Sequence, residues 1–529
     1  MLFTSYGFIA FLAVLFLAYY LVLRKWQWGL LLAASYFFYA FAGLDCLIFI
    51  FLTTASAYVI ARLMDRGHRK EAEFLDQHRA EMEKEERKKY KATQKKKRFR
   101  ILLLGLVLLF GVLAVLKYTG FALLNLNALL GAFGAEKAFS VPDLLLPMGI
   151  SFYIFQTTGY LIDVYRAKTV AEKNPARLAL FVSFFPQLVQ GPISRHSDLA
   201  AQLYAPHDFD RRGFTSGIQR ILWGYFKKLV IADRILVAMR VLVESAESYR
   251  GVYVLLLILL YSAQIYADFT GGMDITIGIA ESLGIRLKEN FKHPFSSKST
   301  KEYWNRWHIT MGSWFTDYVF YPLSVCRPMM KLSTFSRRVL GAKIGKRIPV
   351  YLATVVTWFL TGLWHGAGWN FIVWGLLNCL VILVSQELEP LYAKFRKSAP
   401  RLTSSWGYGK FMAVRTFLLM GLIRSLDCYR DVGLTFRQWG SMLTVWNVGD
   451  FSRGVMTLGL DLADWIILLV GCLVMAVVAS ITAKTDLRER LYDKPILSWV
   501  IFGTLLIAIL LFGAYGVGYD ASQFIYNQF

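Results

Sequence analysis

Two histidines lie in tryptophan-rich stretches of otherwise apolar sequence, where their side chains could carry acid–base chemistry. His365 follows an apolar run and is flanked by Gly362, Gly366 and Gly368. Glycine has no side-chain bulk, so a substrate or a second helix could approach the imidazole closely. Imidazole titrates near neutral pH and is the usual general base in enzymes. His365 is therefore a candidate general base, with a packing role inside a membrane as the alternative.

The spacing of residues around His365 leads to two further expectations. Trp358 lies seven residues before His365 and Trp369 lies four residues after it, so all three could share one face of a helix. Asn370 stands where the HxxxxD box of soluble glycerolipid acyltransferases has its carboxylate. Because that carboxylate is missing, the histidine–aspartate mechanism of those enzymes does not carry over to His365.

His308 belongs to an aromatic stripe in a basic part of the chain. The stripe consists of Trp304, Trp307, His308, Met311, Phe315 and Tyr318. Its helical spacing predicts one amphipathic helix. Two interpretations are open: an aromatic belt at a membrane interface, or a donor-side site in which His308 contacts an acyl thioester.

Polar side chains inside apolar sequence are costly in hydrocarbon and usually face the interior of a helix bundle. They gather here in residues 146–166, 184–195, 261–323 and 357–375. We expect substrate contacts from Trp304, Trp307, Trp364, Trp369, Asn370, Gln156, Gln190 and Asp268. No metal site is expected, because no ligand cluster has suitable spacing. The remaining histidines, at 68, 78, 196, 207 and 293, are expected to be solvent-exposed.

The elements that position these residues follow from the composition. The chain has 529 residues, of which 56% are hydrophobic and 18% are charged. Globular proteins carry about 25% charged residues, so an ordinary soluble enzyme does not fit and an all-α polytopic membrane protein does. The net charge is +23, but the basic residues lie between apolar runs and no nucleic-acid-binding motif accompanies them. They are expected to set membrane topology, and no nucleic-acid partner is expected.

Twelve apolar segments could cross a bilayer, which predicts about 11–12 transmembrane helices. They are residues 6–23, 26–42, 47–63, 101–116, 144–162, 230–242, 252–266, 350–363, 371–384, 411–424, 463–483 and 496–515. Residues 178–195 have basic residues on both sides and contain Pro186, Gly191 and Pro192. We expect a re-entrant segment there, with its backbone buried in protein.

Loop charge predicts the orientation of these helices and a division of the chain. Residues 65–100 carry 14 Lys/Arg against 8 Asp/Glu, and residues 286–347 carry 13 against three. Both are expected on the cytosolic side, with residues 120–143 and the tail after Tyr515 outside. Residues 65–100 are also expected to form a solvent-exposed helix. The predicted division is 1–64 as N-terminal helices, 65–100 as a charged insert, 101–386 as the catalytic core and 387–529 as C-terminal helices.

Ordered motifs along the chain resemble those of one enzyme superfamily. WNRWHIT (Trp304–Thr310) and TGLWHGAGWNF (Thr361–Phe371) resemble the two histidine regions of membrane-bound O-acyltransferases. More narrowly, they resemble the bacterial branch that contains alginate O-acetyltransferases and D-alanyl transfer proteins. Five further blocks are similar to that family: PMGISFYIFQ (147–156), FPQLVQGPI (185–193), IADR (231–234), QIYADFTGGMDITIG (264–278) and ENFKHPF (289–295).

The resemblance implies a helix bundle with re-entrant segments around a central tunnel, in a bacterial inner or plasma membrane. It implies transfer of an acyl group, acetyl above all, from a cytosolic acetyl-CoA or acyl carrier protein to a hydroxyl of a cell-surface polysaccharide. A periplasmic or extracellular acetyltransferase could receive the group as a partner protein. In the superfamily the histidine matching His365 is catalytic, and the loop carrying His308 lies on the donor side. No bound cofactor is expected. Alternatives are D-alanyl transfer to teichoic acid, a transporter and a structural scaffold.

Overall fold

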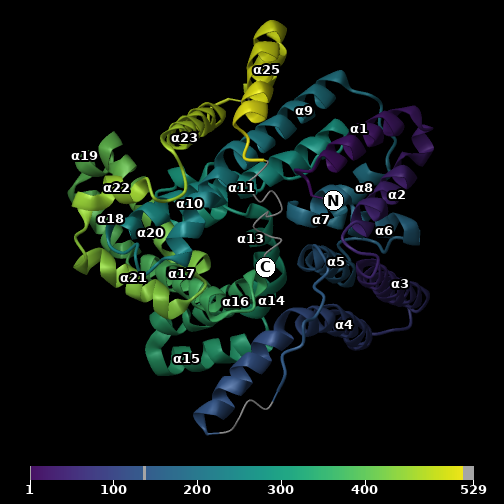
Figure 1. Ribbon diagram of the computed structural model, residues 1–529. Coiled ribbons are helices and arrows are strands. Elements are labelled where there is room, and N and C mark those ends of the chain that lie inside the picture. The colour runs from purple at the N-terminus through teal and green to yellow at the C-terminus, as the bar shows by residue number, and fades with distance from the viewer. Residues whose placement is uncertain (1, 135–138, 486, 516–529) are drawn as a thin grey trace. The chain divides into compact units, whose positions relative to one another are not determined.

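The computed structural model describes residues 2–134, 139–485 and 487–515, and within these ranges the chain is built from α-helices (Figure 1). The β-structure in the same ranges is limited to an isolated antiparallel bridge between Phe291 and Trp307. The chain divides into two compact units. Unit 1 comprises the residues up to Phe214 together with Ile279–Leu287, and unit 2 comprises Thr215–Gly278 and the residues from Lys288 onward.

Unit 1 holds the first eight α-helices, and the N-terminal ends of two of them, α1 and α6, are capped by side chains. The Ser5 hydroxyl accepts a hydrogen bond from the backbone nitrogen of Phe8 at the start of α1, and Asn174 with Pro175 starts α6. Both arrangements satisfy or remove backbone N–H groups that a helix start leaves unpaired. The elements are α1 (Tyr6–Leu21), η1 (Arg24–Trp26), α2 (Gln27–Ala40), α3 (Cys46–Gln77), α4 (Lys84–Ala132), α5 (Ile150–Tyr165), α6 (Pro175–Ser183), α7 (Phe185–Gln190) and α8 (His196–Tyr204).

Unit 2 contains both candidate histidines, and α11 belongs to it up to Gly278. Two of its segments, η2 and η4, are π-helical. Its elements are α9 (Arg211–Tyr225), which begins in unit 1, then η2 (Phe226–Ala232), α10 (Asp233–Glu244), α11 (Val252–Ser282), η3 (Pro294–Ser296), α12 (Thr300–Arg306), α13 (Ile309–Phe315), η4 (Thr316–Phe320), α14 (Tyr321–Ser324), α15 (Arg327–Gly345), α16 (Ile348–His365), α17 (Trp369–Glu387), α18 (Glu389–Ser398), α19 (Pro400–Thr403), α20 (Trp406–Tyr429), α21 (Val432–Thr444), η5 (Val448–Asp450), α22 (Phe451–Val455), α23 (Leu462–Thr482), α24 (Leu487–Tyr492) and α25 (Pro495–Phe512).

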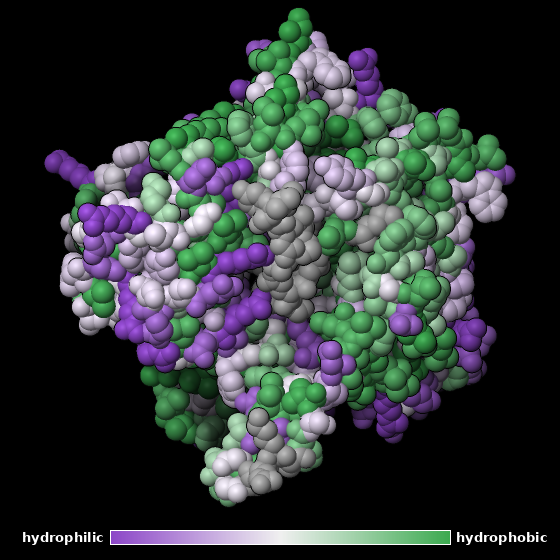
Figure 2. All heavy atoms as spheres, viewed as in Figure 1, coloured by the Kyte–Doolittle hydropathy of each residue, from purple (hydrophilic) through white to green (hydrophobic). Residues whose placement is uncertain are grey.

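Seven helices of the described residues are long and apolar enough to cross a membrane: α3, α4, α11, α16, α17, α23 and α25. Large apolar side chains such as Leu103, Val107, Leu469 and Leu510 are exposed on them. Figure 2 shows hydrophobic residues over much of the visible surface. An apolar exterior of this extent suits lipid contact, and the chain is an all-α polytopic membrane protein.

The structure supports fewer spans than the predicted 11–12. Each of the twelve predicted segments contains helix, although residues 144–149 precede α5, and α2, α5 and α10 have 14, 16 and 12 residues. A straight crossing needs about 20 residues, so these shorter helices are not among the seven, and the number of spans stays a prediction. The predicted orientation of the helices stays a prediction, and the tail after Tyr515 lies outside the described residues. The predicted division of the chain into four segments was based on charge and motifs, and it also stays a prediction.

The charged segment 65–100 is two helices, so the prediction of a single exposed helix was wrong. α3 continues to Gln77 and α4 starts at Lys84, where Glu83 and Glu86 form a capping box. Across the two helices, an Arg98 guanidinium nitrogen lies 2.5 Å from a Glu71 carboxylate oxygen. Lysine, arginine and glutamate are good helix formers, so the flanking apolar helices extend into this segment and pair there.

Residues 178–195 contain two short helices and are largely buried in protein, as expected, while their re-entry from one side of the membrane stays a prediction. α6 ends at Ser183, α7 is six residues long with Pro186 in its first turn, and the chain is extended from Gly191. Residues 181–194 are buried throughout. Irregular backbone is thus enclosed by protein, as a membrane protein requires.

Candidate active site

His365 is the last residue of α16, at the turn of a tight helical hairpin with α17. The helix ends there because Gly366 and Gly368 have extended backbones, and α17 then starts at Trp369. A Cβ at Gly362 would lie 2.4 Å from the Phe371 carbonyl oxygen, so this glycine allows the second helix to approach. Because the helix breaks after His365, the prediction that Trp369 shares its face was wrong.

The imidazole of His365 is enclosed by two indoles. Its ring centroid lies 5.0 Å from that of Trp364 and 4.6 Å from that of Trp374, both edge-on. Trp374 is buried in a core cluster with Ile423 and Leu426. The position of His365 is therefore fixed by the hydrophobic core rather than by a mobile loop.

His308 lies in a break between two helices, so the predicted single amphipathic helix is absent here. α12 ends at Arg306, α13 begins at Ile309, and His308 has φ 48° in the left-handed region. The break arises because residues 290–292 pair with 306–309: Lys292 N–H donates to the Arg306 carbonyl, and Ile309 N–H donates to the Asn290 carbonyl. Tertiary pairing here overrides local helical spacing.

Burial argues against one of the two interpretations of this stripe, and the donor-side site stays a prediction. Trp307 and His308 are 3% and 0% exposed, which does not fit an aromatic belt at a membrane interface. The low exposure places His308 in the interior of unit 2. Burial, together with the nearby Arg424 guanidinium, lowers the pKa of His308 to about 3. The imidazole is accordingly neutral at physiological pH.

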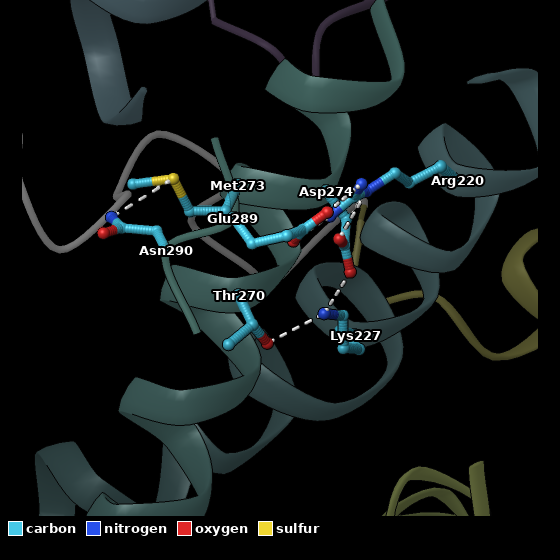
Figure 3. Close-up of polar contacts among 7 residues, drawn as sticks. All are labelled: Arg220, Lys227, Thr270, Met273, Asp274, Glu289 and Asn290. Atoms are coloured by element: carbon cyan, nitrogen blue, oxygen red, sulfur yellow. Dashed lines mark hydrogen bonds and ion pairs between the residues drawn. The ribbon is translucent and has the colours of Figure 1, made fainter. Parts of the chain in front are cut away.

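Asn290 holds His308 and the start of α13 together through its side chain. Its Oδ1 accepts hydrogen bonds from the backbone nitrogen of Thr310 at 2.9 Å and from the Thr310 hydroxyl at 3.0 Å. Its Nδ2 lies 3.1 Å from His308 Nδ1 and 3.6 Å from Met273 Sδ, the latter contact drawn in Figure 3. Asn290 is part of the ENFKHPF block, but no role for it was predicted.

An ion network that is largely enclosed apart from the exposed Glu289 anchors the segment that carries Asn290 (Figure 3). Arg220 of α9 donates two hydrogen bonds of 2.7 Å to Glu289 and one of 2.8 Å to Asp274 of α11. Lys227 lies 2.6 Å from the same Asp274 and donates to the Thr270 hydroxyl at 2.8 Å. Two-pronged arginine–carboxylate pairs give directional as well as energetic restraint. Three members lie in the blocks 264–278 and 289–295, but the sequence did not predict their pairing with Arg220 and Lys227, because the five residues are spread over 70 positions.

The two candidate histidines converge on one side chain. The ring centroid of Trp364 lies 5.7 Å from that of His308 and 5.0 Å from that of His365. Trp364 is 5% exposed. Three residues predicted separately from two motifs are thus brought into one place.

Trp304 and Trp307 pack beside this place. Trp304 Nε1 donates to Asn378 Oδ1 at 3.2 Å, and its ring lies edge-on to Trp358 and Trp374. Trp307 is stacked on Tyr303 and lies under the Arg424 guanidinium, whose central carbon is 4.1 Å from the ring centroid. These contacts show that both indoles support the site, and their predicted contact with substrate stays a prediction.

The other candidates are distributed over both units. In unit 2, Trp369 is 57% exposed, Asn370 is buried at the start of α17, and Asp268 is fully buried 2.6 Å from Lys228. In unit 1, Gln156 donates to the Phe181 carbonyl at 2.8 Å, and Gln190 is fully buried at the end of α7. Their contact with substrate also stays a prediction.

Of the histidines expected on the surface, His196 departs from the prediction. It is 8% exposed and packs against Tyr160 and Phe181. Burial lowers its pKa to about 4. The polar flanking sequence concealed an inward-facing position in α8. In the part of the chain that the structure describes, no group of three or more potential metal ligands is found.

Comparison with known proteins gives a consistent set of matches. A model of the membrane-bound O-acyltransferase family matches residues 172–426, which include both histidines, Trp364 and Asn290. The probable alginate O-acetylase AlgI of Azotobacter vinelandii is 32% identical over 86% of this chain and 81% of its own length. The peptidoglycan O-acetyltransferase of Helicobacter pylori is 32% identical over 57% of this chain and 58% of its own. The teichoic acid D-alanyltransferase of Bacillus subtilis is 27% identical over 48% and 62%, respectively.

Proposed function

Since this chain belongs to the membrane-bound O-acyltransferase family and is an O-acyltransferase, we propose that it transfers an acetyl group from a cytosolic thioester to a hydroxyl of a cell-surface polysaccharide. Membership of an acyltransferase family argues against the alternatives of a transporter and a structural scaffold. The observation that carries the proposal is the convergence of His308 and His365 on Trp364. It places a neutral imidazole of the donor-side motif against the same indole as a candidate general base.

The proposed reaction is a direct transfer in one addition–elimination sequence. The acceptor hydroxyl oxygen bonds to the thioester carbonyl carbon while His365 takes the hydroxyl proton. The negative charge that develops on the carbonyl oxygen is stabilised by a hydrogen bond from His308. The carbon–sulfur bond then breaks, and the proton on His365 passes to the leaving thiolate. A positioned base typically contributes about 10²–10⁴-fold to such a rate.

The extent of the sequence matches favours acetyl over D-alanyl as the group transferred. The alginate O-acetylase relative matches 86% of this chain, whereas the D-alanyltransferase relative matches 48%. Residues 286–347 carry ten more basic than acidic residues (13 − 3), and such a surface attracts the phosphates of coenzyme A. An acidic carrier protein would also be attracted, so the donor has to be tested directly.

The proposed setting is the bacterial inner membrane, with the donor in the cytosol and the acceptor outside. The acceptor is an exported polysaccharide, or a periplasmic acetyltransferase that passes the group on. Besides the donor and the acceptor, the protein is expected to contact membrane lipid.

The test is a donor comparison with purified protein in lipid vesicles. Acetyl-CoA and a D-alanyl-loaded carrier protein are supplied separately, with alginate or peptidoglycan fragments as acceptors, and the esterified polymer is measured by mass spectrometry. We expect acetyl ester from acetyl-CoA, and none from a His365→Ala variant. Transfer of D-alanine alone would establish the alternative and overturn acetylation.

A further inference from the structure

We propose that Asn290 is a positioning residue that fixes the tautomer of His308, so that His308 presents an N–H donor to the thioester carbonyl oxygen rather than acting as a second base. The assignment of Asn290 and the ring proton stands on the hydrogen-bond geometry and the burial of His308. The identity of the carbonyl rests on the proposed function.

The orientation of the Asn290 amide is set by a backbone group. The Thr310 N–H can only donate, and it points at the Asn290 oxygen over 2.9 Å. The Thr310 hydroxyl adds a second hydrogen bond to the same oxygen at 3.0 Å. The amide nitrogen therefore occupies the other position, where Met273 Sδ and His308 Nδ1 are its neighbours.

The amide orientation in turn sets the ring proton of His308. His308 Nδ1 lies 3.1 Å from the amide nitrogen and 3.3 Å from the amide oxygen. The oxygen already accepts two hydrogen bonds from Thr310, and an amide NH₂ group can only donate. His308 Nδ1 is therefore the acceptor of the nearer amide nitrogen. A neutral imidazole that accepts at one nitrogen carries its proton on the other. Burial keeps the ring neutral, because it lowers the pKa of His308 to about 3. His308 is thus held with its proton on Nε2.

The position of Asn290 is itself firmly held. The backbone carbonyl of Asn290 accepts a hydrogen bond from Ile309 N–H at 3.0 Å. The backbone and the side chain of Asn290 therefore both bind the segment that follows His308. The neighbouring Glu289 is held by Arg220, which also binds Asp274 of α11 (Figure 3). This ion network links α9 and α11 to the residue that orients the histidine.

The consequence is a division of labour between the two histidines. An N–H donor aimed at the oxygen where charge develops is worth about 10²–10³-fold in rate. His308 supplies that donor and His365 accepts the hydroxyl proton. The charged and titratable groups near His308 include Arg424, which lies over Trp307, and His365, which packs against the same Trp364 indole.

The Asn290→Asp variant reverses the proton arrangement with little change of shape. One carboxylate oxygen still accepts from Thr310, but the other replaces the amide donor with an acceptor. His308 then has to carry a proton on Nδ1, and Nε2 loses its proton at neutral pH. The carboxylate also raises the pKa of His308, because the charged imidazolium gains an ionic partner. Below that raised pKa both nitrogens carry protons, so the Nε2–H donor returns.

We therefore expect the acetyl-transfer rate of Asn290→Asp to fall by about 10²-fold at neutral pH. The ratio of the variant rate to the wild-type rate should then rise as the pH is lowered. The pH dependence that comes from His365 is the same in both proteins, so it drops out of this ratio. The control is Met273→Leu, which removes the other contact of the Asn290 amide and should follow the wild-type pH profile. A variant-to-wild-type ratio that is independent of pH would overturn the proposal.

A second measurement needs neither substrate nor turnover. In ¹⁵N-histidine NMR of the purified wild-type protein, the signals missing from a His308→Asn variant belong to His308. We expect the proton on Nε2 and an unprotonated Nδ1. A proton on Nδ1 would refute the assignment even if acetyl transfer is confirmed. The expected pattern would uphold it even if the donor proves to be a different thioester or Asn290→Asp fails to fold.

Discussion

The imidazole of His365 lies edge-on to the indole of Trp374, with ring centroids 4.6 Å apart. His365 ends one helix of the hairpin and Trp374 lies in the first two turns of the other. Because Trp374 belongs to a buried cluster, the candidate base is positioned by the packing of α16 against α17. Disturbing that packing and removing the imidazole are therefore separable experiments.

Removing the imidazole should abolish transfer without unfolding the protein. We expect His365→Ala to lower the acetyl-transfer rate by about 10²-fold or more, since a general base typically contributes at least that much. The midpoint of thermal unfolding should stay near that of wild type. His78→Ala, in the charged hairpin of α3 and α4, is the matched control and should retain full activity. A His365→Ala rate above a tenth of wild type would exclude the role.

Widening the hairpin should reduce both stability and rate while the imidazole remains. A Cβ at Gly362 would meet the Phe371 carbonyl oxygen at 2.4 Å, and overpacking of this kind costs about 1–3 kcal/mol. Gly362→Ala should therefore lower the unfolding temperature and the transfer rate together. Gly503→Ala is the control, because no atom lies within 4 Å of its added carbon. Equal unfolding temperatures in both variants would contradict a tight hairpin.

The buried Asp268 can be tested as an ion partner against its predicted role in substrate contact. Lys228 Nζ lies 2.6 Å from Asp268 and 2.8 Å from Asp233, and all three residues are buried. Removing one partner of a buried ion pair costs about 3–5 kcal/mol. Asp268→Ala should therefore lower the yield of folded protein and its unfolding temperature, whereas the exposed Asp493→Ala should not. A stable Asp268→Ala protein with only a raised substrate KM would favour substrate contact instead.

Lys298 and Lys301 test whether the sequence before His308 attracts the donor. Both side chains are exposed, and an anionic donor would be attracted to them with a strength that salt screens. Reversing both charges to Glu should raise the apparent donor KM at low salt and flatten its salt dependence, with the acceptor KM little changed. Reversal of the exposed Lys397 in α18 is the control. Unchanged donor kinetics at low ionic strength would remove this stretch from the donor path.

The predicted orientation can be measured by accessibility of single cysteines. In a background without the five native cysteines, a cysteine at Lys95 should react with an impermeant maleimide only from the cytosolic side. The outside position predicted from the sequence, Ala135, lies outside the described residues, so Ser140 in the same connection serves in its place. A cysteine there should react only from the outside. Reaction of both from one side would reverse the topology derived from loop charge.

The sequence identified the helices well and their ends less well. Apolar runs located α11, α16 and α17, because burial in protein or lipid needs apolar side chains whatever the tertiary arrangement. It missed that α3 and α4 continue through residues 65–100, because charged helix formers carry no apolar signal there. The ends of the predicted segments also differ from the helices, since the length of an apolar run does not report where helix geometry ends.

The site shows the same limit more sharply. His308, Trp364 and His365 were found from their motifs, and the structure brings them together. The break at His308 was not foreseen, because it depends on pairing with residues 290–292, which local spacing does not report. Asn290 was missed for the same reason, because its proposed role depends on the tertiary contacts of its side-chain amide, which the sequence alone does not report.

The left-handed backbone of His308 also limits how this position can change by mutation. A φ of 48° is adopted readily by glycine and, among residues with a side chain, mainly by asparagine, aspartate and histidine. β-branched or bulky residues would strain the chain where it pairs with residues 290–292. A directed-evolution library at this codon should therefore recover few folded variants. Asparagine is the substitution that combines a permitted backbone with a neutral N–H donor.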